Sequence, residues 1–157
     1  MPTKTIAHHP LLLLVLICLG LGIYKAVTLA CISNDSVTFL ECAEHIKSDP
    51  VEAMKSHYQP PGFPAAILLA ETIMESVTGR LSVQQKVIAG QIVNLLCRII
   101  AVGFLYGIFL HFGTRKTAFI NTLLVILIPA YADNGSDVLS DWPNLMFMTV
   151  GFFCCLK

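Results

Sequence analysis

The sequence has little charge and long stretches without any acidic residue. Charged residues make up 13% of the 157 residues, about half of the roughly 25% that soluble domains carry. No Asp or Glu occurs in residues 1–34 or 76–132, and the ten acids fall into two groups, at 35–75 and 133–141. The mean hydropathy is +0.73. This distribution predicts a membrane protein with a polar site on one face.

The sequence also lacks a basic patch and a CxxC pair. Its formal net charge is zero, which argues against electrostatic capture of nucleic acid. Without a CxxC pair, neither a zinc site nor a disulfide framework is predicted. Five of the six cysteines fall in apolar segments or at their ends, where Cys packs as a small apolar side chain.

Four apolar segments are predicted to cross the membrane as helices, because about 20 apolar residues span the hydrocarbon core. The first contains Lys25 near its far end, where a long side chain can reach the interface. A cleaved signal peptide is the alternative for this segment, and we favour an uncleaved anchor. The fourth runs to the end of the chain. The predicted spans are 11–32, 87–112, 117–132 and 142–157.

The two polar segments, 33–86 and 133–141, are predicted to be loops on the outer face. In the first, apolar spacing and turn residues predict short helices at 37–47, 50–55 and 65–77. The Pro-Pro-Gly-Phe-Pro stretch at 60–64 is expected to be non-helical. Gly79 is expected to end the helix at 65–77, which is short for a span and fits an interfacial position better. The predicted fold is an all-α, multi-pass transmembrane bundle with juxtamembrane helices in the first outer loop.

The positions of the basic residues predict which side of the membrane each loop faces. Arg115 and Lys116 form a turn between the second and third spans, and cytoplasmic loops favour such residues. A cytoplasmic amino terminus places this turn inside and both acidic loops outside, at the cell (inner) membrane. Gln91, Asn94 and Arg98 recur at three- and four-residue intervals in the second span, so they share a face that should meet a partner or a wet cavity.

The order of these features resembles the amino-terminal part of the polyprenyl-phosphate-sugar-dependent membrane glycosyltransferases, which include the protein O-mannosyltransferases and the lipid A aminoarabinose transferase. Residues 34–41, Asn-Asp-Ser-Val-Thr-Phe-Leu-Glu, resemble the family's first-loop motif, with Ser36 where a second acid often stands. Residues 57–64, His-Tyr-Gln-Pro-Pro-Gly-Phe-Pro, are similar to its proline turn. Residues 128–130 and 140–143, Ile-Pro-Ala and Ser-Asp-Trp-Pro, are similar to its second outer loop.

The resemblance implies roles for particular residues. Asp35 would be the general base that takes the proton of the acceptor hydroxyl, and Asp141 would orient the acceptor or help Asp35 hold a divalent metal. The departing lipid phosphate would be stabilised by cations, of which Lys86, Lys25 and Arg98 are the candidates in that order. His57 and Gln59 of the proline turn are further candidates for substrate binding.

The implied partners are a polyprenyl-phosphate-linked sugar donor, a lipid, glycan or protein acceptor, and membrane lipids. The family's members have more spans, so the resemblance also implies that the chain is an incomplete part of such an enzyme. Structural interpretations remain open, because Asp35 and Asp141 are each placed where an acid commonly caps a helix. The alternative function is a small non-catalytic membrane subunit or transporter fragment that uses Gln91, Asn94 and Arg98 for contacts between helices.

Overall fold

The computed structural model describes residues 8–28, 33–56, 60–128 and 141–156. Within these ranges the chain forms seven helices and no strand, which confirms the predicted all-α class. The helices are α1 (His8–Thr28), α2 (Asn34–Ser48), α3 (Pro50–Ser56), α4 (Gly62–Thr78), α5 (Val83–Phe112), α6 (Arg115–Leu127) and α8 (Asp141–Cys155).

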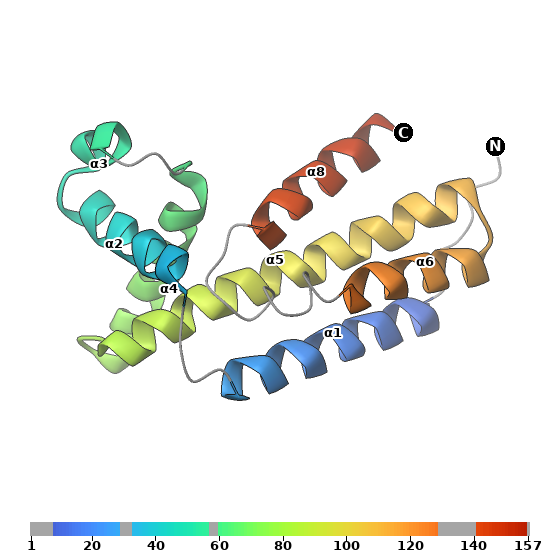
Figure 1. Cartoon of the computed structure of the whole chain (residues 1–157), viewed down its shortest axis with the longest axis horizontal. Helices are drawn as coiled ribbons and strands as arrows, with labels where there is room; N and C mark the ends of the chain where they lie inside the picture. Colours follow the sequence, from blue (N-terminus) through green and yellow to red (C-terminus); the bar gives the residue numbers. More distant parts are fainter. Residues whose placement is uncertain (1–7, 29–32, 57–59, 129–140, 157) are drawn as a thin grey trace.

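Helix α5 is the centre of the arrangement. It contacts α1, α2, α4, α6 and α8. Figure 1 shows α1, α6 and α8 running beside α5, while α2, α3 and α4 gather around its amino-terminal part. Helices α1 and α5 run in opposite directions, so the end of α1 and the starts of α2 and α5 lie toward the same end of the molecule (Figure 1).

Two apolar cores hold these parts together. One joins α1, α5, α6 and α8 and includes Cys18, Tyr106 and Trp142, none of which has exposed surface. The other joins α2 and α4 to α5 around Phe39 and Phe63, whose ring centroids lie 5.2 Å apart in an edge-to-face contact. The second core therefore fixes the helices of the first polar segment on the amino-terminal half of α5.

Side-chain caps set where several helices begin. The Ser33 side chain accepts a hydrogen bond from the backbone of Ser36, so α2 begins at Asn34. The predicted helix at 37–47 is thus three residues longer at its start. The Asp49 carboxylate accepts hydrogen bonds from the backbone amides of Val51 and Glu52 in the first turn of α3. Ser82 and Gln85 form a reciprocal capping box, which starts α5 at Val83.

The prediction that residues 60–64 are non-helical is wrong for the last three of them. Helix α4 begins at Gly62, so residues 62–64 are helical. Pro64 fits because the amide groups in the first turn of a helix have no partner within the helix. Gly79 ends α4 as predicted: its φ is +79°, and its amide donates to the Glu75 carbonyl oxygen.

Two helices in the described part of the chain are long and apolar enough to cross a membrane. They are His9–Thr28, with a mean hydropathy of 2.3, and Val83–Phe112, with 2.1. The predicted third and fourth spans are helices of only 13 and 15 residues. The backbone of Ile128 is extended, with φ −57° and ψ 122°. Because a proline disfavours helical backbone at the residue before it, Pro129 explains why α6 ends at Leu127.

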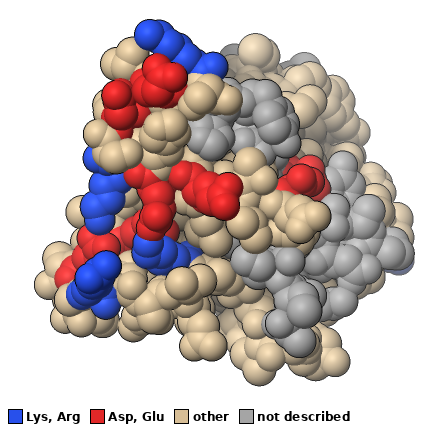
Figure 2. Space-filling model, turned by 60° about the vertical axis from the view of Figure 1, so that its left-hand side comes forward, with Lys and Arg blue, Asp and Glu red and all other residues tan. Residues whose placement is uncertain are grey.

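Charged side chains are concentrated on one part of the surface. In the view of Figure 2, most of the Lys, Arg, Asp and Glu side chains gather on one side, and a smaller acidic patch lies apart from them. The helices outside the first polar segment carry exposed apolar side chains such as Leu16 (55% exposed), Val27 (80%) and Phe147 (68%). An exposed surface of this kind is typical of contact with lipid or with another apolar surface.

Candidate functional site

Asp35 lies in the first turn of α2 and is exposed. Its neighbour Ser36 is fully buried, and the Ser36 hydroxyl shares a hydrogen bond with the hydroxyl of Ser33, the cap of α2. The backbone before and after Asp35 is therefore held in place. An acid in the first turn favours the helix dipole. The same position also leaves the carboxylate of Asp35 open to solvent, where a substrate could reach it.

Asp141 has the same placement on another helix. It lies in the first turn of α8 and is exposed, whereas the next two residues, Trp142 and Pro143, are buried. Helices α2 and α8 both contact α5, and Figure 1 shows both beginning beside its amino-terminal half and middle, on the same side. The two predicted catalytic acids therefore lie in the first turns of two helices that both pack against α5.

Arg98 lies inside the protein. Its side chain has no exposed surface, and its guanidinium carbon is 4.9 Å from the centroid of the Trp142 ring. Within the described part of the chain, none of its three guanidinium nitrogens has a hydrogen-bond partner. Asn94, one turn earlier on α5, is also fully buried. Asn94 and Arg98 share a face of α5, as predicted, and that face is turned inward, whereas Gln91 is only partly buried.

Lys86, the first candidate for the phosphate, is already paired. It lies near the start of α5 and forms an ion pair with Glu44 of α2. A second pair, Lys47 with Glu75 at 2.8 Å, joins α2 to α4. Both pairs connect α2 to its neighbours at partly exposed positions, where such pairs contribute about 0–1 kcal/mol each. Glu44 takes one of the three donors of the Lys86 ammonium and competes with a substrate for its charge.

Three predicted residues cannot be placed. His57 and Gln59 lie outside the described residues, and so does the side chain of Lys25, whose backbone belongs to α1.

Glu71 is a buried acid that sequence reasoning did not single out. Its side chain on α4 is 2% exposed. Burial raises the pKa of its carboxyl and Glu75 raises it further, while Lys47 lowers it. The signal was available in the sequence, since Phe63, Ile67 and Glu71 are spaced four apart and continue one buried stripe.

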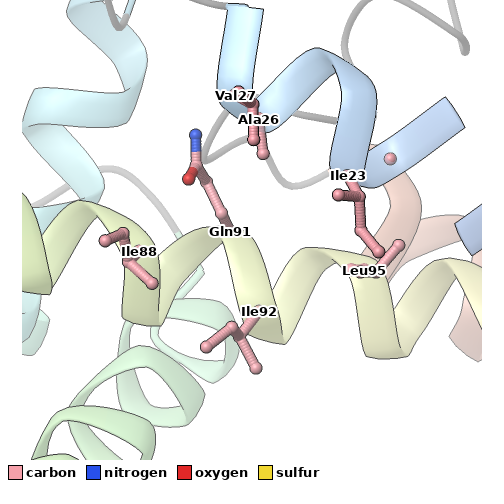
Figure 3. Close-up of a pocket in the computed structure, with 8 residues that line it drawn as sticks. Ile23, Ala26, Val27, Ile88, Gln91, Ile92 and Leu95 are labelled. Carbon is pink, nitrogen blue, oxygen red and sulfur yellow. The ribbon is translucent and has the colours of Figure 1, made fainter. Parts of the chain in front are cut away.

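A cavity of about 310 Å³ lies between the end of α1 and the first half of α5. Figure 3 shows Ile23 of α1 and Leu95 of α5 pointing toward one another, with Gln91 extending toward the same gap. Gln91 is its one polar side chain, so the space suits an apolar group. The lining residues are Gly22, Ile23, Ala26, Val27, Ile88, Gln91, Ile92 and Leu95.

The described residues contain no group of three or more His, Cys, Asp or Glu side chains that could hold a metal ion. The metal that the resemblance implies stays a prediction.

Comparisons with protein-family models, curated proteins and solved structures found no match to this chain.

Proposed function

We propose that this chain belongs to a membrane glycosyltransferase that moves a sugar from a lipid-phosphate donor to an acceptor hydroxyl, with inversion at the anomeric carbon. The observation that supports it is the matched position of Asp35 and Asp141. Each is exposed in the first turn of a helix that contacts α5. Sequence resemblance selects the same two acids.

In the proposed reaction, the Asp35 carboxylate accepts the proton of the acceptor hydroxyl as its oxygen attacks the anomeric carbon. The carbon–oxygen bond to the lipid phosphate breaks, and the phosphate leaves with the electron pair. Asp141 orients the acceptor hydroxyl. Lys86 exchanges its Glu44 partner for the departing phosphate and stabilises its negative charge.

The proposal places the chain in the cell (inner) membrane. Helices α1 and α5 have the length and hydropathy of crossing segments. We propose that α6 and α8 belong to two further crossing segments of a multi-pass bundle. Their exposed apolar side chains, including Leu124 (59% exposed) and Met148 (73%), fit contact with lipid.

The test is sugar transfer by membranes that contain the protein, using a labelled polyprenyl-phosphate sugar and measuring the release of the lipid phosphate. Asp35→Asn keeps the shape of the side chain and removes its basicity, so the rate should fall by about 10²–10⁴-fold. Glu41→Gln is the matched control, because Glu41 is an exposed acid farther along the same helix. Equal rates for wild type and Asp35→Asn would contradict the assignment.

The alternative is a non-catalytic membrane subunit or transporter fragment whose α5 polar face binds another protein. Asn94 and Arg98 have no exposed surface within the chain's own fold. This burial counts against their use in contacts with a second protein, and we therefore favour the enzyme.

A further inference from the structure

Small residues leave a cavity between the two helices that are long and apolar enough to cross a membrane. The cavity, of about 310 Å³, is lined on α1 by a stripe that contains Gly22 and Ala26 and on α5 by a stripe that contains Ile88 and Ile92. Positions spaced three and four apart share one face of a helix, so two largely apolar faces meet here. Because α1 and α5 run in opposite directions (Figure 1), the cavity lies lengthwise between them, over about 10 Å of α5.

The two ends of the cavity differ. A Cβ atom at Gly22 would lie 2.6 Å from Cδ1 of Leu95, so the Leu95 side chain rests on the backbone of α1 and closes this end. At the other end are Val27 and Ile88, whose side chains are 80% and 46% exposed. This open end lies toward the end of α1 and the start of α5, where α2, α3 and α4 gather (Figure 1). An occupant would therefore enter beside the polar segment and extend inward to Leu95.

The size and chemistry of the cavity exclude two kinds of occupant. A buried water makes about two to four hydrogen bonds, whereas Gln91 is the one polar side chain of the lining. A helix with its side chains is about 10 Å or more across, so a 10 Å length of it fills roughly 800 Å³, more than twice this space. An empty cavity would leave its apolar lining without van der Waals contacts. The space therefore suits a narrow apolar chain.

We propose that this cavity binds one acyl chain of a membrane glycerophospholipid. Helices α1 and α5 have the length and hydropathy of crossing segments, and the acyl chains of a bilayer extend inward from its surface along the same direction. The headgroup lies at the surface beside the polar segment, and the chain extends between the helices to Leu95. The inference rests on the membrane position of α1 and α5, which is part of the proposed function, but not on glycosyl transfer.

Packing selects the chain. The surrounding hydrocarbon is as apolar as the lining, so transfer of a chain from one to the other gives little hydrophobic driving force. The gain comes from the contacts that fill the hollow left by Gly22 and Ala26. An unbranched chain is narrow enough to make these contacts along its whole length, whereas an isoprenoid carries methyl branches and is broader. The site should therefore prefer a phospholipid to a polyprenyl phosphate.

Photo-crosslinking of the full chain in lipid nanodiscs tests the site. The discs hold one copy of the chain, so a second copy cannot fill the cavity. They consist of phosphatidylcholine, a small fraction of which carries a diazirine halfway along one acyl chain. Irradiation joins this chain to its nearest residues, and mass spectrometry of the peptides locates them. We expect the crosslinks to concentrate on residues 22–27 and 88–95 over the exposed apolar face of α8, which includes Phe147 and Met148. Equal labelling of the two regions in the wild-type protein would overturn the proposal.

Two variants separate binding in the cavity from contact with surrounding lipid. Ala26→Leu places a larger side chain in the cavity and should remove most of the crosslinking at residues 88–95. Gly20→Leu is the matched control, because it adds the same side chain to α1 where a Cβ atom meets nothing within 4 Å. It should leave the crosslinking as in wild type. Unchanged crosslinking in a folded Ala26→Leu variant would overturn the assignment of the site.

Competition identifies the class of lipid. Polyprenyl phosphate, added in an amount equal to the labelled lipid, should leave the crosslinking at the cavity unchanged. Loss of the crosslinks under this condition would show that an isoprenoid, and not an acyl chain, is the occupant. Crosslinking at the cavity by a protein that transfers no sugar would contradict the proposed function alone.

Discussion

Glu71 shows how one residue can make the fold sensitive to pH. Glu71 is on the buried face of α4 and is 2% exposed. Its Oε1 atom has no hydrogen-bond partner within the described residues. The positive charge that partly compensates Glu71 is Lys47, which already bonds to Glu75. Burying the ionised form without a full set of partners is unfavourable, so the pKa of Glu71 is raised, mainly by burial and then by Glu75.

Glu71→Gln should make the protein more stable at neutral pH. Because the folded pKa is raised, the folded protein binds the proton more tightly than the unfolded chain does. Between the ordinary pKa and the raised one, the free energy of unfolding falls as pH rises. The variant lacks this fall and should exceed wild type by on the order of 1 kcal/mol above that window. Below the window the two should agree. Thermal unfolding in detergent from about pH 4 to about pH 8 measures the difference.

Glu41→Gln is the control, because Glu41 is an exposed acid on α2. It should change the stability by no more than about 0.5 kcal/mol and leave the pH dependence of wild type in place. An unchanged pH dependence in Glu71→Gln would show that the Glu71 carboxyl is not the source of the effect.

At the scale of single helices, two prolines explain where the observed boundaries differ from the predicted ones. Pro129 ends α6 at Leu127, five residues before the predicted end of the third span. Pro64 does not delay α4, because it occupies the first turn, where its missing amide costs nothing. Composition and spacing located the described helices. They do not determine whether a proline lies inside the first turn of a helix, as Pro64 does, or just beyond its last turn, as Pro129 does.

Gly107 allows α8 to pack closely on α5. A Cβ atom at position 107 would lie 2.8 Å from Cε2 of the Phe153 ring, closer than carbon atoms approach in proteins. That ring is also in edge-to-face contact with Phe104, at 5.3 Å between centroids, so it has little freedom to yield. We expect Gly107→Ala to lower the free energy of unfolding by about 1–3 kcal/mol, the usual cost of overpacking. Chemical unfolding in detergent, followed by circular dichroism, measures it.

Gly103, one turn earlier on α5, is the matched control. A Cβ atom at this position meets nothing within 4 Å. Gly103→Ala should be neutral or stabilise α5 by up to about 1 kcal/mol, since Ala favours helix more than Gly does. Equal losses at the two positions would mean that helix propensity, and not contact with Phe153, determines the effect.

At the scale of the whole molecule, the sequence predicted the helical class and the shared polar face of α5, but not that Asn94 and Arg98 are turned inward or how Arg98 is enclosed. The spacing of Asn94 and Arg98 requires that they share a face. It cannot say that Trp142, 44 residues later, covers the guanidinium, because that contact depends on how α8 packs against α5. The pairing of Lys86 with Glu44 is equally a tertiary contact between α2 and α5. Asp35 and Asp141 were predicted from motifs, and the structure adds that both are exposed first-turn acids.

The orientation of the molecule decides whether the two acids can serve one site. Helix α2 follows the end of α1, and α8 begins beside the middle of α5 (Figure 1). If α1, α5 and the third predicted span, which includes α6, cross the membrane in alternating directions, then Asp35 and Asp141 lie on the same face. The basic start of α6, with Arg115 and Lys116, lies at the opposite end of α5 and should face the cytoplasm.

Cysteine labelling on intact cells tests this orientation. Single cysteines are placed at Asn34, Asp141 and Lys116, all of which are exposed, in a chain whose six native cysteines are replaced. An impermeant maleimide should label positions 34 and 141 on intact cells and position 116 only after the membrane is opened, because charged reagents do not cross the hydrocarbon core. Labelling of all three on opened cells is the control for reactivity. If positions 34 and 141 were labelled from opposite sides, Asp35 and Asp141 could not act on one substrate. Label at position 116 on intact cells would then mean that α4 crosses the membrane, and no label there would mean that the segment containing α6 does not cross.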